Sequence, residues 1–441
     1  MPSPGSFDSV TEVPADATIY RRVTMRQQPR VTWTDQAGSH QKLLSERVGV
    51  GSAAGNDLEI ADPTVSRIHA ELDPREGSVW VRDLGSRNGT FVENVRVTDA
   101  EVPDGGSVLV GGTVLRIERI GQPTAIDLWP THTFGQLVGK SVVMRELFAR
   151  MNRIAGLDAT VLIQGETGTG KELCAEAIHH ASTRADRPFV VVDCAALPES
   201  LLEAELFGHV KGAFTGAATS RDGAFHEAEG GTVLLDEIGE LPPGMQPKLL
   251  RVVETHAVRH IGETAYRKID VRIMAASNRD LRTMVNAGAF REDLYFRLAV
   301  VPITMPPLRD RLDDVPLLVQ RFAGPRASTL LTPQLLQEIA VRPWPGNVRE
   351  LKNFIDRVTA LGTAEALALA SPGTLPRPSV ELPPVSIDRP FKSVREEWLN
   401  HLERHYVRQL LERHQRNISA AADAAGLDRT YLHRLIRKHG L

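Results

Sequence analysis

The chain has 441 residues, of which 42% are hydrophobic and 24% charged, and its formal net charge is -3. This length is more than one hydrophobic core supports, so we expect about three domains. The near-neutral charge argues against a protein that coats nucleic acid over its whole surface, and two cysteines are too few for a disulfide framework. No basic segment followed by an apolar run opens the chain, and no stretch approaches the roughly 18 apolar residues of a membrane helix. We therefore expect a cytoplasmic protein without a membrane partner.

The N-terminal part divides into a tail and a β-rich domain. Residues 1–28 are rich in Pro, Ser, Thr and Asp without periodicity, which predicts a disordered tail. From residue 29 to residue 120, short β-type runs alternate with Gly, Asn, Asp and Pro turns. This spacing is typical of a β-sandwich.

Two loop segments of the predicted sandwich, residues 62–72 and 83–97, concentrate hydroxyl, guanidinium and amide donors, which suit capture of a phosphate group. The segments resemble the forkhead-associated (FHA) family, whose members bind phosphothreonine peptides. That family has Arg where this chain has Ser52, and Arg67 or Arg87 is the available substitute. A sandwich kept only for protein contacts is the alternative, because the same residue types are common in turns. The candidate phosphopeptide contacts are Ser52, Ser66, Arg67, Ser86, Arg87 and Asn88.

After a predicted linker at residues 121–134, an α/β pattern begins. A helical repeat and the buried strand 159–164 lead directly into the Gly-rich segment GETGTGKE. Its glycines let backbone N–H groups turn toward phosphate oxygens, the next helix offers its positive end, and Lys171 can reach the terminal phosphates of ATP. Glu172 stands where many such loops have a Ser or Thr ligand for Mg²⁺. The nucleotide-binding candidates are Gly165, Glu166, Thr167, Gly168, Thr169, Gly170, Lys171 and Glu172.

A second apolar strand, residues 232–235, ends in two carboxylates. Asp236 suits Mg²⁺ coordination, and Glu237 suits polarisation of the attacking water. A solvated acidic pair is the alternative, which the apolar strand ahead of it disfavours. Asn278, at the end of another buried strand, could sense the γ-phosphate. Three arginines are candidates for stabilising the transferred phosphoryl group, although each could equally form a surface salt bridge: Arg291, Arg297 and Arg349.

Between these two halves of the ATP site lies ELFGHVKGAFTGA, residues 205–217. Its tip carries Phe214 and Thr215 on backbone with almost no side chains to pack them down. A functional loop and an ordinary Gly-rich turn whose Phe folds into the core are both open from spacing alone. The tip residues are Gly212, Ala213, Phe214, Thr215, Gly216 and Ala217.

Residues 135–372 as a whole resemble the AAA+ domain of sigma-54-dependent transcription activators. The resemblance rests on GETGTGKE, ELFGHVKGAFTGA, GGTVLLDEIGELP, FREDLYFRL, PPLRDR and WPGNVREL. It implies an ATPase with a helical lid, a tip that contacts sigma-54 through Phe214 and Thr215, and arginine fingers used between subunits of a hexameric ring. It further implies that Asn278 and Arg349 are sensors. Asp193 stands where many relatives have Asn, and would face Glu237 with like charge.

The C-terminal part begins with a Pro-rich linker, residues 373–390. In residues 391–441, a long amphipathic helix precedes a short helix, a turn at Gly426 and a basic helix, which is the form of a helix-turn-helix. This segment resembles the Fis-type domain that ends most members of the family. A basic helical tail without DNA binding is the alternative. The candidate contacts to double-stranded DNA are Arg429, Thr430, His433, Arg434, Arg437 and Lys438.

The sequence therefore predicts a multidomain chain: a β-sandwich, an α/β P-loop ATPase with a lid, and an all-α helix-turn-helix. We expect an ATP- and Mg²⁺-dependent activator that binds upstream DNA, remodels sigma-54 RNA polymerase and forms dimers or rings. Ser/Thr phosphorylation would regulate it, with Thr11, Thr18 or Thr24 as the ligand of the sandwich. The alternatives are a general AAA+ remodeller and a DNA-binding repressor with an idle ATPase.

Overall fold

The computed structural model describes residues 20–24, 28–44, 47–75, 78–120, 124–213, 219–326, 342–362, 391–414 and 418–439, with 332, 335–336 and 339. Contacts divide the chain into two compact units, Met1–Ala366 and Leu367–Leu441. Within the described ranges, none of the helices combines the length and the apolar character needed to cross a bilayer.

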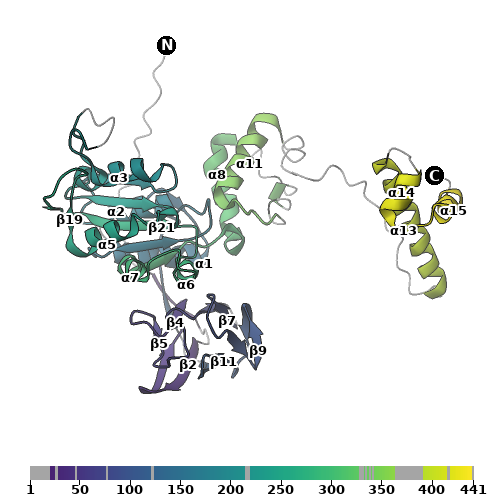
Figure 1. Ribbon diagram of the computed structural model, residues 1–441, viewed down its shortest axis with the longest axis horizontal. Helices are drawn as coiled ribbons and strands as arrows, with labels where there is room; N and C mark the ends of the chain where they lie inside the picture. Colours follow the sequence, from purple (N-terminus) through teal and green to yellow (C-terminus); the bar gives the residue numbers. More distant parts are fainter. Residues whose placement is uncertain are drawn as a thin grey trace, which may run out of the picture. The chain divides into compact units, whose positions relative to one another are not determined.

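The predicted β-sandwich forms the first part of the N-terminal unit (Figure 1). Its strands are β2 (Gln28–Asp35), β3 (Gly38–Leu43), β4 (Val48–Gly51), β5 (Leu58–Glu59), β6 (Ala70–Arg75), β7 (Ser78–Asp83), β8 (Thr90–Val92), β9 (Val95–Val97), β10 (Asp99–Val102), β11 (Ser107–Val110) and β12 (Thr113–Ile120). One sheet has the order β10-β7-β6-β4-β5 and the other β3-β2-β12-β11-β8-β9. Buried residues alternate along β7 and β11, so one face of each strand meets the shared core.

The ATPase part is built on a five-stranded parallel sheet. Its strands are β16 (Val161–Gln164), β17 (Phe189–Asp193), β18 (Thr232–Asp236), β21 (Arg272–Ser277) and β22 (Val301–Thr304). Their order is β17-β18-β21-β16-β22. The central strands β16, β18 and β21 are buried at nearly every position because both faces of the sheet are covered, as parallel sheets require.

Two clusters of apolar side chains cover the two faces of the sheet. The helices α1 (Val142–Ala155) and α2 (Lys171–His180) pack on one face, where Ile163, Leu234 and Met274 point. The helices α3 (Glu199–Phe207), α5 (Gln246–Thr255) and α7 (Glu292–Leu298) pack on the other. Because side chains alternate along each strand, the same strands supply both clusters.

The predicted tail and linker differ from the structure. Residues 20–24, assigned to the disordered tail, form β1 (Tyr20–Thr24), and residues 124–128, assigned to the linker, form β13 (Thr124–Leu128). The two strands pair antiparallel from Tyr20 opposite Leu128 to Thr24 opposite Thr124. Each strand is short, and its partner lies about a hundred residues away in sequence, so local periodicity carries no sign of the pairing.

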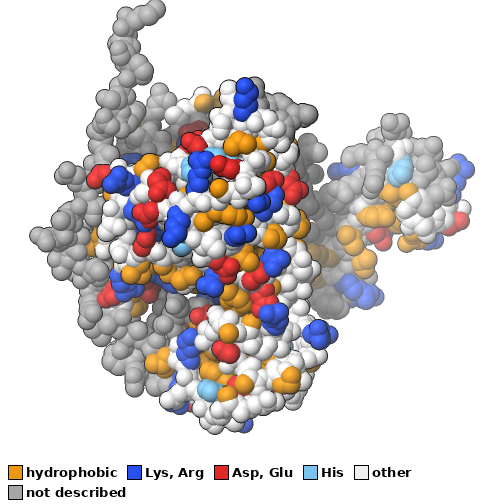
Figure 2. Space-filling model, turned by 60° about the vertical axis from the view of Figure 1, so that its left-hand side comes forward, with side chains coloured by type: hydrophobic (Ala, Val, Ile, Leu, Met, Phe, Trp, Pro, Cys, Tyr) orange, Lys and Arg blue, Asp and Glu red, His pale blue; other side chains and the backbone are white. Residues whose placement is uncertain are grey.

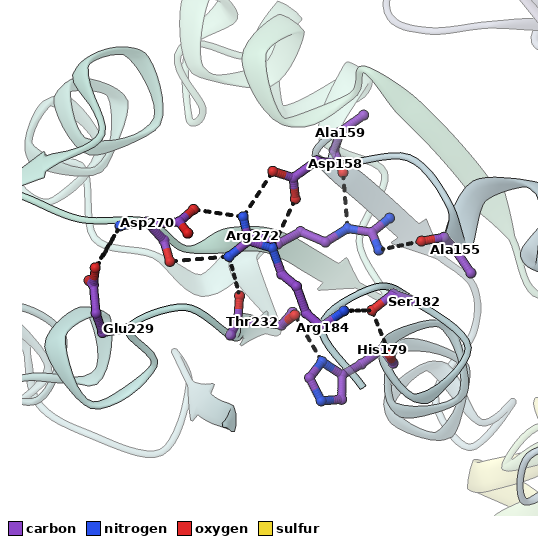
Figure 3. A network of polar contacts seen from close by, with 11 residues as sticks. Ala155, Asp158, Ala159, His179, Ser182, Arg184, Glu229, Thr232, Asp270 and Arg272 are labelled. Carbon is purple, nitrogen blue, oxygen red and sulfur yellow. Dashed lines mark hydrogen bonds and ion pairs between the residues drawn. The ribbon is translucent and has the colours of Figure 1, made fainter. Parts of the chain in front are cut away.

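A polar network lies at the N-terminal end of β21, at the other end of the strands from the nucleotide loop (Figure 3). Arg272 of β21, 3% exposed, donates to the carbonyls of Ile154, Ala155 and Ala159 at 3.0–3.4 Å. These carbonyls lie at the C-terminal end of α1 and just beyond it, where helix carbonyls lack partners within the helix. Arg184 beside it bonds Asp158 and Asp270.

The remaining elements complete the two units. In the first unit these are β14 (Thr133–Phe134), β15 (Leu137–Val138), α4 (Ala224–Glu227), β19 (Ala257–Val258), β20 (Arg267–Lys268), α6 (Leu281–Asn286), α8 (Val315–Ala323) and α11 (Asn347–Leu361), with 3-10 turns at Ile238–Glu240, Leu308–Asp310, Leu312–Asp314 and Gly324–Arg326. The second unit contains α13 (Phe391–Arg413), α14 (Ile418–Ala425) and α15 (Arg429–His439). Its small core joins Val407 and Leu411 of α13 to Ala421, Ala422, Leu432 and Leu435.

Candidate functional site

The phosphate loop lies between β16 and α2. Gly168 and Gly170 have φ of 79° and 102°, values that glycine adopts without strain. Lys171 begins α2, is 7% exposed, and donates from Nζ to the carbonyl of Gly165 at 3.2 Å. The turn, the helix N-terminus and the lysine therefore have the arrangement that phosphate binding requires.

The carboxylate pair lies at the end of β18, next to this loop. Lys171 Nζ is 3.6 Å from a carboxylate oxygen of Glu237, whose backbone is left-handed with φ of 48°. Glu237 Oε2 accepts from the backbone N–H of Asn278 at 3.1 Å, and the amide of Asn278 donates to Thr167 Oγ1 at 3.0 Å. Burial, together with the neighbouring charge of Glu237, raises the pKa of Asp236. Four predicted residues thus meet around one loop.

Asp193 ends β17 directly opposite Asp236. Its Oδ1 accepts from the backbone N–H of Ala195 at 2.8 Å, so the hydrogen bond recorded for this carboxylate goes to its own loop rather than to Glu237. Its charge adds to the rise in the pKa of Asp236. The acidic group at this position therefore acts on Asp236, the candidate Mg²⁺ ligand.

Sequence reasoning missed three residues that support the loop. Arg309 donates two hydrogen bonds to Glu166, at 2.7 and 2.9 Å, and lowers the pKa of that carboxyl. The fully buried Asn347 donates to Glu166 and to the carbonyl of Thr167. Arg311, whose pKa burial lowers to about 10, donates to the carbonyl of Thr169 at 3.0 Å. Arg309 and Arg311 lie in PPLRDR and Asn347 lies in WPGNVREL, two motifs that were used only to identify the family resemblance.

The lid contributes Arg349. Its backbone N–H and that of Val348 donate to the carbonyl of Gly168, which brings the start of α11 onto the phosphate loop. A Cβ on Gly168 would lie 2.2 Å from the carbonyl oxygen of Gly346, so this approach requires glycine. A pocket of about 500 Å³ opens here, lined by Thr167, Gly346, Arg349, Glu350, Asn353, Asp356 and Arg357.

The two other arginines do not line this pocket. Arg291 pairs with Asp293 at 2.7 Å, two residues along the chain, and Arg297 of α7 pairs with Glu254 at 3.3 Å. Both side chains are about half exposed or more. Such positions allow either arginine to reach another molecule.

Only the base of the loop between the two halves of the ATP site is described. Gly212 and Ala213 lie within it, whereas Phe214, Thr215, Gly216 and Ala217 lie outside the described residues. At the base, His209 forms isolated bridges with Arg221 and with Ile261.

The candidate phosphopeptide residues of the sandwich separate into two groups. Ser52 Oγ donates to the carbonyl of Val65, Ser86 Oγ donates to Asp83, and the Asn88 amide donates to the carbonyl of Thr64, so these three hold the loops. Ser66 Oγ accepts from the N–H of Arg87 and keeps its own proton for another acceptor. Arg67 and Arg87 are exposed. The donors available to a phosphate are therefore Ser66, Arg67 and Arg87.

His69 organises the same loops as a buried structural residue. Burial lowers its pKa, which favours the neutral ring. Nδ1 accepts from the N–H of Ser66 at 3.0 Å, so Nε2 carries the proton and faces the carbonyl of Gly89 at 3.2 Å.

Within the first unit, the sandwich contacts α6 and α7 of the ATPase. Ile68 and Leu84 are buried in the same apolar cluster as Leu294. The amide of Asn286 donates to the carbonyls of Ile68 and Leu84 at 2.6 and 2.7 Å. Four ion pairs surround these contacts: Arg67 with Glu292, Arg82 with Asp280, and Arg282 with both Glu71 and Asp57. The loop that carries Arg67 thus reaches the residue next to Arg291.

In the C-terminal unit, the six candidate DNA contacts are exposed on or at the start of α15. The Lys438 ammonium also pairs with Glu403 of α13 at 2.7 Å, which ties the end of α15 to α13. The turn at Gly426 has φ of 64°, which a glycine adopts readily. By contrast, on the face of the molecule shown in Figure 2, basic and acidic side chains of the first unit are intermixed.

Three family descriptions match the chain: the sigma-54 interaction domain at residues 137–304, the FHA domain at 48–111 and the AAA+ ATPase lid domain at 309–374. The transcriptional regulatory protein ZraR of Klebsiella oxytoca is 46% identical over 314 residues, which cover 69% of this chain and 68% of that protein. The anaerobic nitric oxide reductase transcription regulator NorR of Salmonella dublin is 43% identical over 318 residues, 69% of this chain and 63% of that protein.

A crystal structure of NtrX from Brucella abortus in complex with ADP is 33% identical, with a TM-score of 0.50, and the match covers 69% of this chain and 70% of that one. The chain spans less than two thirds of the NorR relative's own length. The phosphate loop, the carboxylates at the end of β18 and the lid helix α11 are the parts expected of these matched domains. The chain belongs to the family of sigma-54-dependent transcription regulators and carries an N-terminal FHA domain.

Proposed function

We propose that the chain is an ATP-driven transcription activator that binds upstream DNA and uses hydrolysis to remodel closed complexes of sigma-54 RNA polymerase. The observation that carries this proposal is the convergence of Lys171, Glu237 and Asn278 on one loop, in a member of this family. A repressor with an idle ATPase has no need of such an arrangement.

In this proposal, Lys171 and the loop amides neutralise the phosphates of ATP, and Asp236 holds Mg²⁺, which would offset the growing charge on the phosphoryl group. Glu237 polarises the attacking water. Its carboxylate is fixed by the N–H of Asn278, while the Asn278 amide is bonded to Thr167. A shift of Thr167 after hydrolysis would therefore reach Glu237 through a single residue.

The exposed Arg291 and Arg297 act on the ATP of a neighbouring subunit, which requires a dimer or, for activity, a ring. Their partners Asp293 and Glu254 are exposed ion-pair partners, and such pairs cost little to break. Phe214 and Thr215 at the loop tip contact sigma-54, and hydrolysis moves that tip.

The C-terminal unit binds double-stranded DNA through α15. Arg429, Arg434 and Arg437 are exposed along it, and Leu432 and Leu435 bury the opposite side in the core of the unit. A helix that is fixed on its apolar side and basic on the other suits entry into a major groove, where arginines contact phosphates and base edges.

Phosphorylation regulates the activator through the sandwich. A Ser/Thr kinase modifies Thr11 or Thr18, which lie outside the described residues, or Thr24 at the end of β1, and the phosphothreonine binds Ser66, Arg67 and Arg87. Because Arg67 pairs with Glu292 at 2.8 Å, a bound phosphate competes with a contact to the helix that follows Arg291. The kinase step is tested by phosphorylating the purified chain: an unmodified tail, or activation unchanged by Ser66→Ala, would remove this part of the proposal.

The whole proposal is tested by transcription from a sigma-54 promoter in a purified system. We expect Glu237→Gln to bind ATP but lose hydrolysis and activation, and Thr215→Ala to hydrolyse ATP but lose activation. Thr219→Ala, an exposed position beside the loop, is the matched control and should behave as the unmodified chain. A general remodeller would hydrolyse ATP without activating the promoter, and a repressor would be indifferent to Glu237→Gln. Activation that survives both substitutions would refute the mechanism.

A further inference from the structure

Two histidines and an aspartate meet beside the base of the loop, away from the ATP site. Asp222 directly follows Arg221, His226 lies in α4, and His260 follows β19. One potential ligand atom from each of the three residues lies within 4.8 Å of the others. The two imidazole rings are 4.7 Å apart between centroids, with an interplanar angle of 60°.

The ring nitrogens of this cluster lack hydrogen-bond partners among the described residues. Both nitrogens of His226 and both of His260 are buried, and His260 is only 3% exposed. The nearest acids stand slightly too far for a hydrogen bond: Asp222 is 3.5 Å from His260 Nε2, and Glu263 is 3.6 Å from His260 Nδ1. An unpaired buried polar group costs roughly 1–3 kcal/mol, so a site with four such atoms calls for an explanation.

We propose that Asp222, His226 and His260 bind a divalent transition metal of the zinc class. Imidazole nitrogen and carboxylate oxygen are the ligands that Zn²⁺ accepts in three-residue sites, which leave the fourth position to water. Ligands about 2.0–2.2 Å from zinc stand roughly 3.5 Å apart in a tetrahedral site, and the 3.5 Å between Asp222 and His260 Nε2 already meets this separation. Metal coordination then supplies partners for two of the unpaired nitrogens.

Glu263 is the positioning residue of this site. Its carboxylate lies on the Nδ1 side of His260, while Nε2 faces Asp222. A carboxylate that accepts the second ring N–H fixes the tautomer and orientation of a metal-binding histidine. Arg267 holds Glu263 from the other side at 2.9 Å.

A metal at this location would stabilise the base of the loop formed by residues 205–217. Asp222 follows Arg221, which bridges to His209 at the loop base, and His260 precedes Ile261, whose N–H donates to the carbonyl of Gly208. The N–H of Val210 donates in turn to the carbonyl of Ile261 at 3.1 Å. The metal therefore cross-links the loop base to the segment between β19 and β20, and stabilises that base.

The test is a zinc titration of the purified full chain, stripped with a chelator and held in excess Mg²⁺ so that the ATP site does not take up zinc. Free zinc is set by competition with a chromophoric chelator. We expect one tight site per chain, and the thermal unfolding midpoint of the ATPase domain should rise with zinc. Co²⁺ in the same site should give the intense visible bands of a tetrahedral complex, which need no variant to observe.

Three variants and one control separate this site from zinc binding elsewhere. Glu263→Gln should weaken zinc binding roughly 10-fold, as loss of an outer carboxylate does, and His226→Ala and His260→Ala should weaken it further. His256→Asn is the matched control, because His256 is exposed on the same segment and Asn tolerates its φ of 47°. Absence of tight zinc binding and of the cobalt bands in the unmodified chain would overturn the proposal, as would equal loss in His256→Asn.

Discussion

At the scale of single residues, Arg309 lies outside the nucleotide loop and holds it through two hydrogen bonds to Glu166. We expect Arg309→Ala to weaken ATP binding, because Glu166 then loses a bidentate partner while its second partner, Asn347, remains. The pair is about half exposed, so the loss is on the order of 1 kcal/mol, or about fivefold in Kd. Equilibrium titration with a fluorescent ATP analogue measures it. Arg309→Lys keeps the positive charge but cannot donate two parallel hydrogen bonds to Glu166, so its Kd should lie between those of the unmodified chain and Arg309→Ala. An unchanged Kd in Arg309→Ala would contradict this role.

Arg272 lies at the N-terminal end of β21, at the other end of the strands from the nucleotide loop (Figure 3). Replacing it with Met leaves the carbonyls of Ala155 and Ala159 without this donor, whereas the carbonyl of Ile154 keeps the backbone N–H of Leu157. We therefore expect the ATPase domain to lose roughly 3 kcal/mol. Hydrogen exchange of the α1 and β21 amides in increasing urea measures the loss. Lys268→Met, at an exposed position of β20, should cost less than about 0.5 kcal/mol. Equal effects of the two substitutions would show that the carbonyl contacts are unimportant.

At the scale of elements, the sequence predicted those whose signal is local. The glycines before Lys171 and the apolar strand before Asp236 are each contained in a stretch of a few consecutive residues, so each could be recognised from sequence. The pairing of β1 with β13 and the bonds of Arg309 and Asn347 to Glu166 join segments at least a hundred residues apart. The metal-ligand cluster was missed for a related reason, since Asp222 and His226 form no known motif with His260. Their proximity depends on the bridges of His209.

The recognition loops of the sandwich form an element whose order depends on pH. His69 has its pKa lowered from its ordinary value of 6.5 by burial, so the unfolded chain binds a proton before the folded one does. Stability from the neutral ring is complete above pH 6.5 and declines as pH falls below it toward the lower folded pKa. We therefore expect thermal unfolding of the sandwich to shift down between pH 7 and about pH 5. The shift should shrink in His69→Gln, and a pH dependence unaltered by this substitution would exclude His69 as its source.

On the scale of the whole molecule, a regulator needs contacts between its sensing and working domains that can be broken. The contact of the sandwich with α6 and α7 combines a small apolar centre, Ile68 and Leu84, with polar pairs around it. Pairs exposed at a rim are weak, so a phosphopeptide that takes Arg67 from Glu292 removes only part of the contact. Release then depends on the bonds of Asn286 and on the buried pair of Arg282 with Glu71.

Asn286→Asp tests this dependence with almost no change in shape. The Asn286 amide donates to the carbonyls of both Ile68 and Leu84, whereas a carboxylate in its place would face two acceptors with no proton to share. We expect the sandwich to separate from the ATPase, which faster hydrogen exchange at residues 66–72 and 281–298 would report. Asn94→Asp, in an exposed turn of the sandwich, changes the net charge equally and should leave both segments protected. If Asn286→Asp leaves exchange unchanged, the contact does not depend on these bonds. If exchange rises and the rate of ATP hydrolysis changes with it, the sandwich acts on the ATPase through α6 and α7, the elements that lead to and follow Arg291.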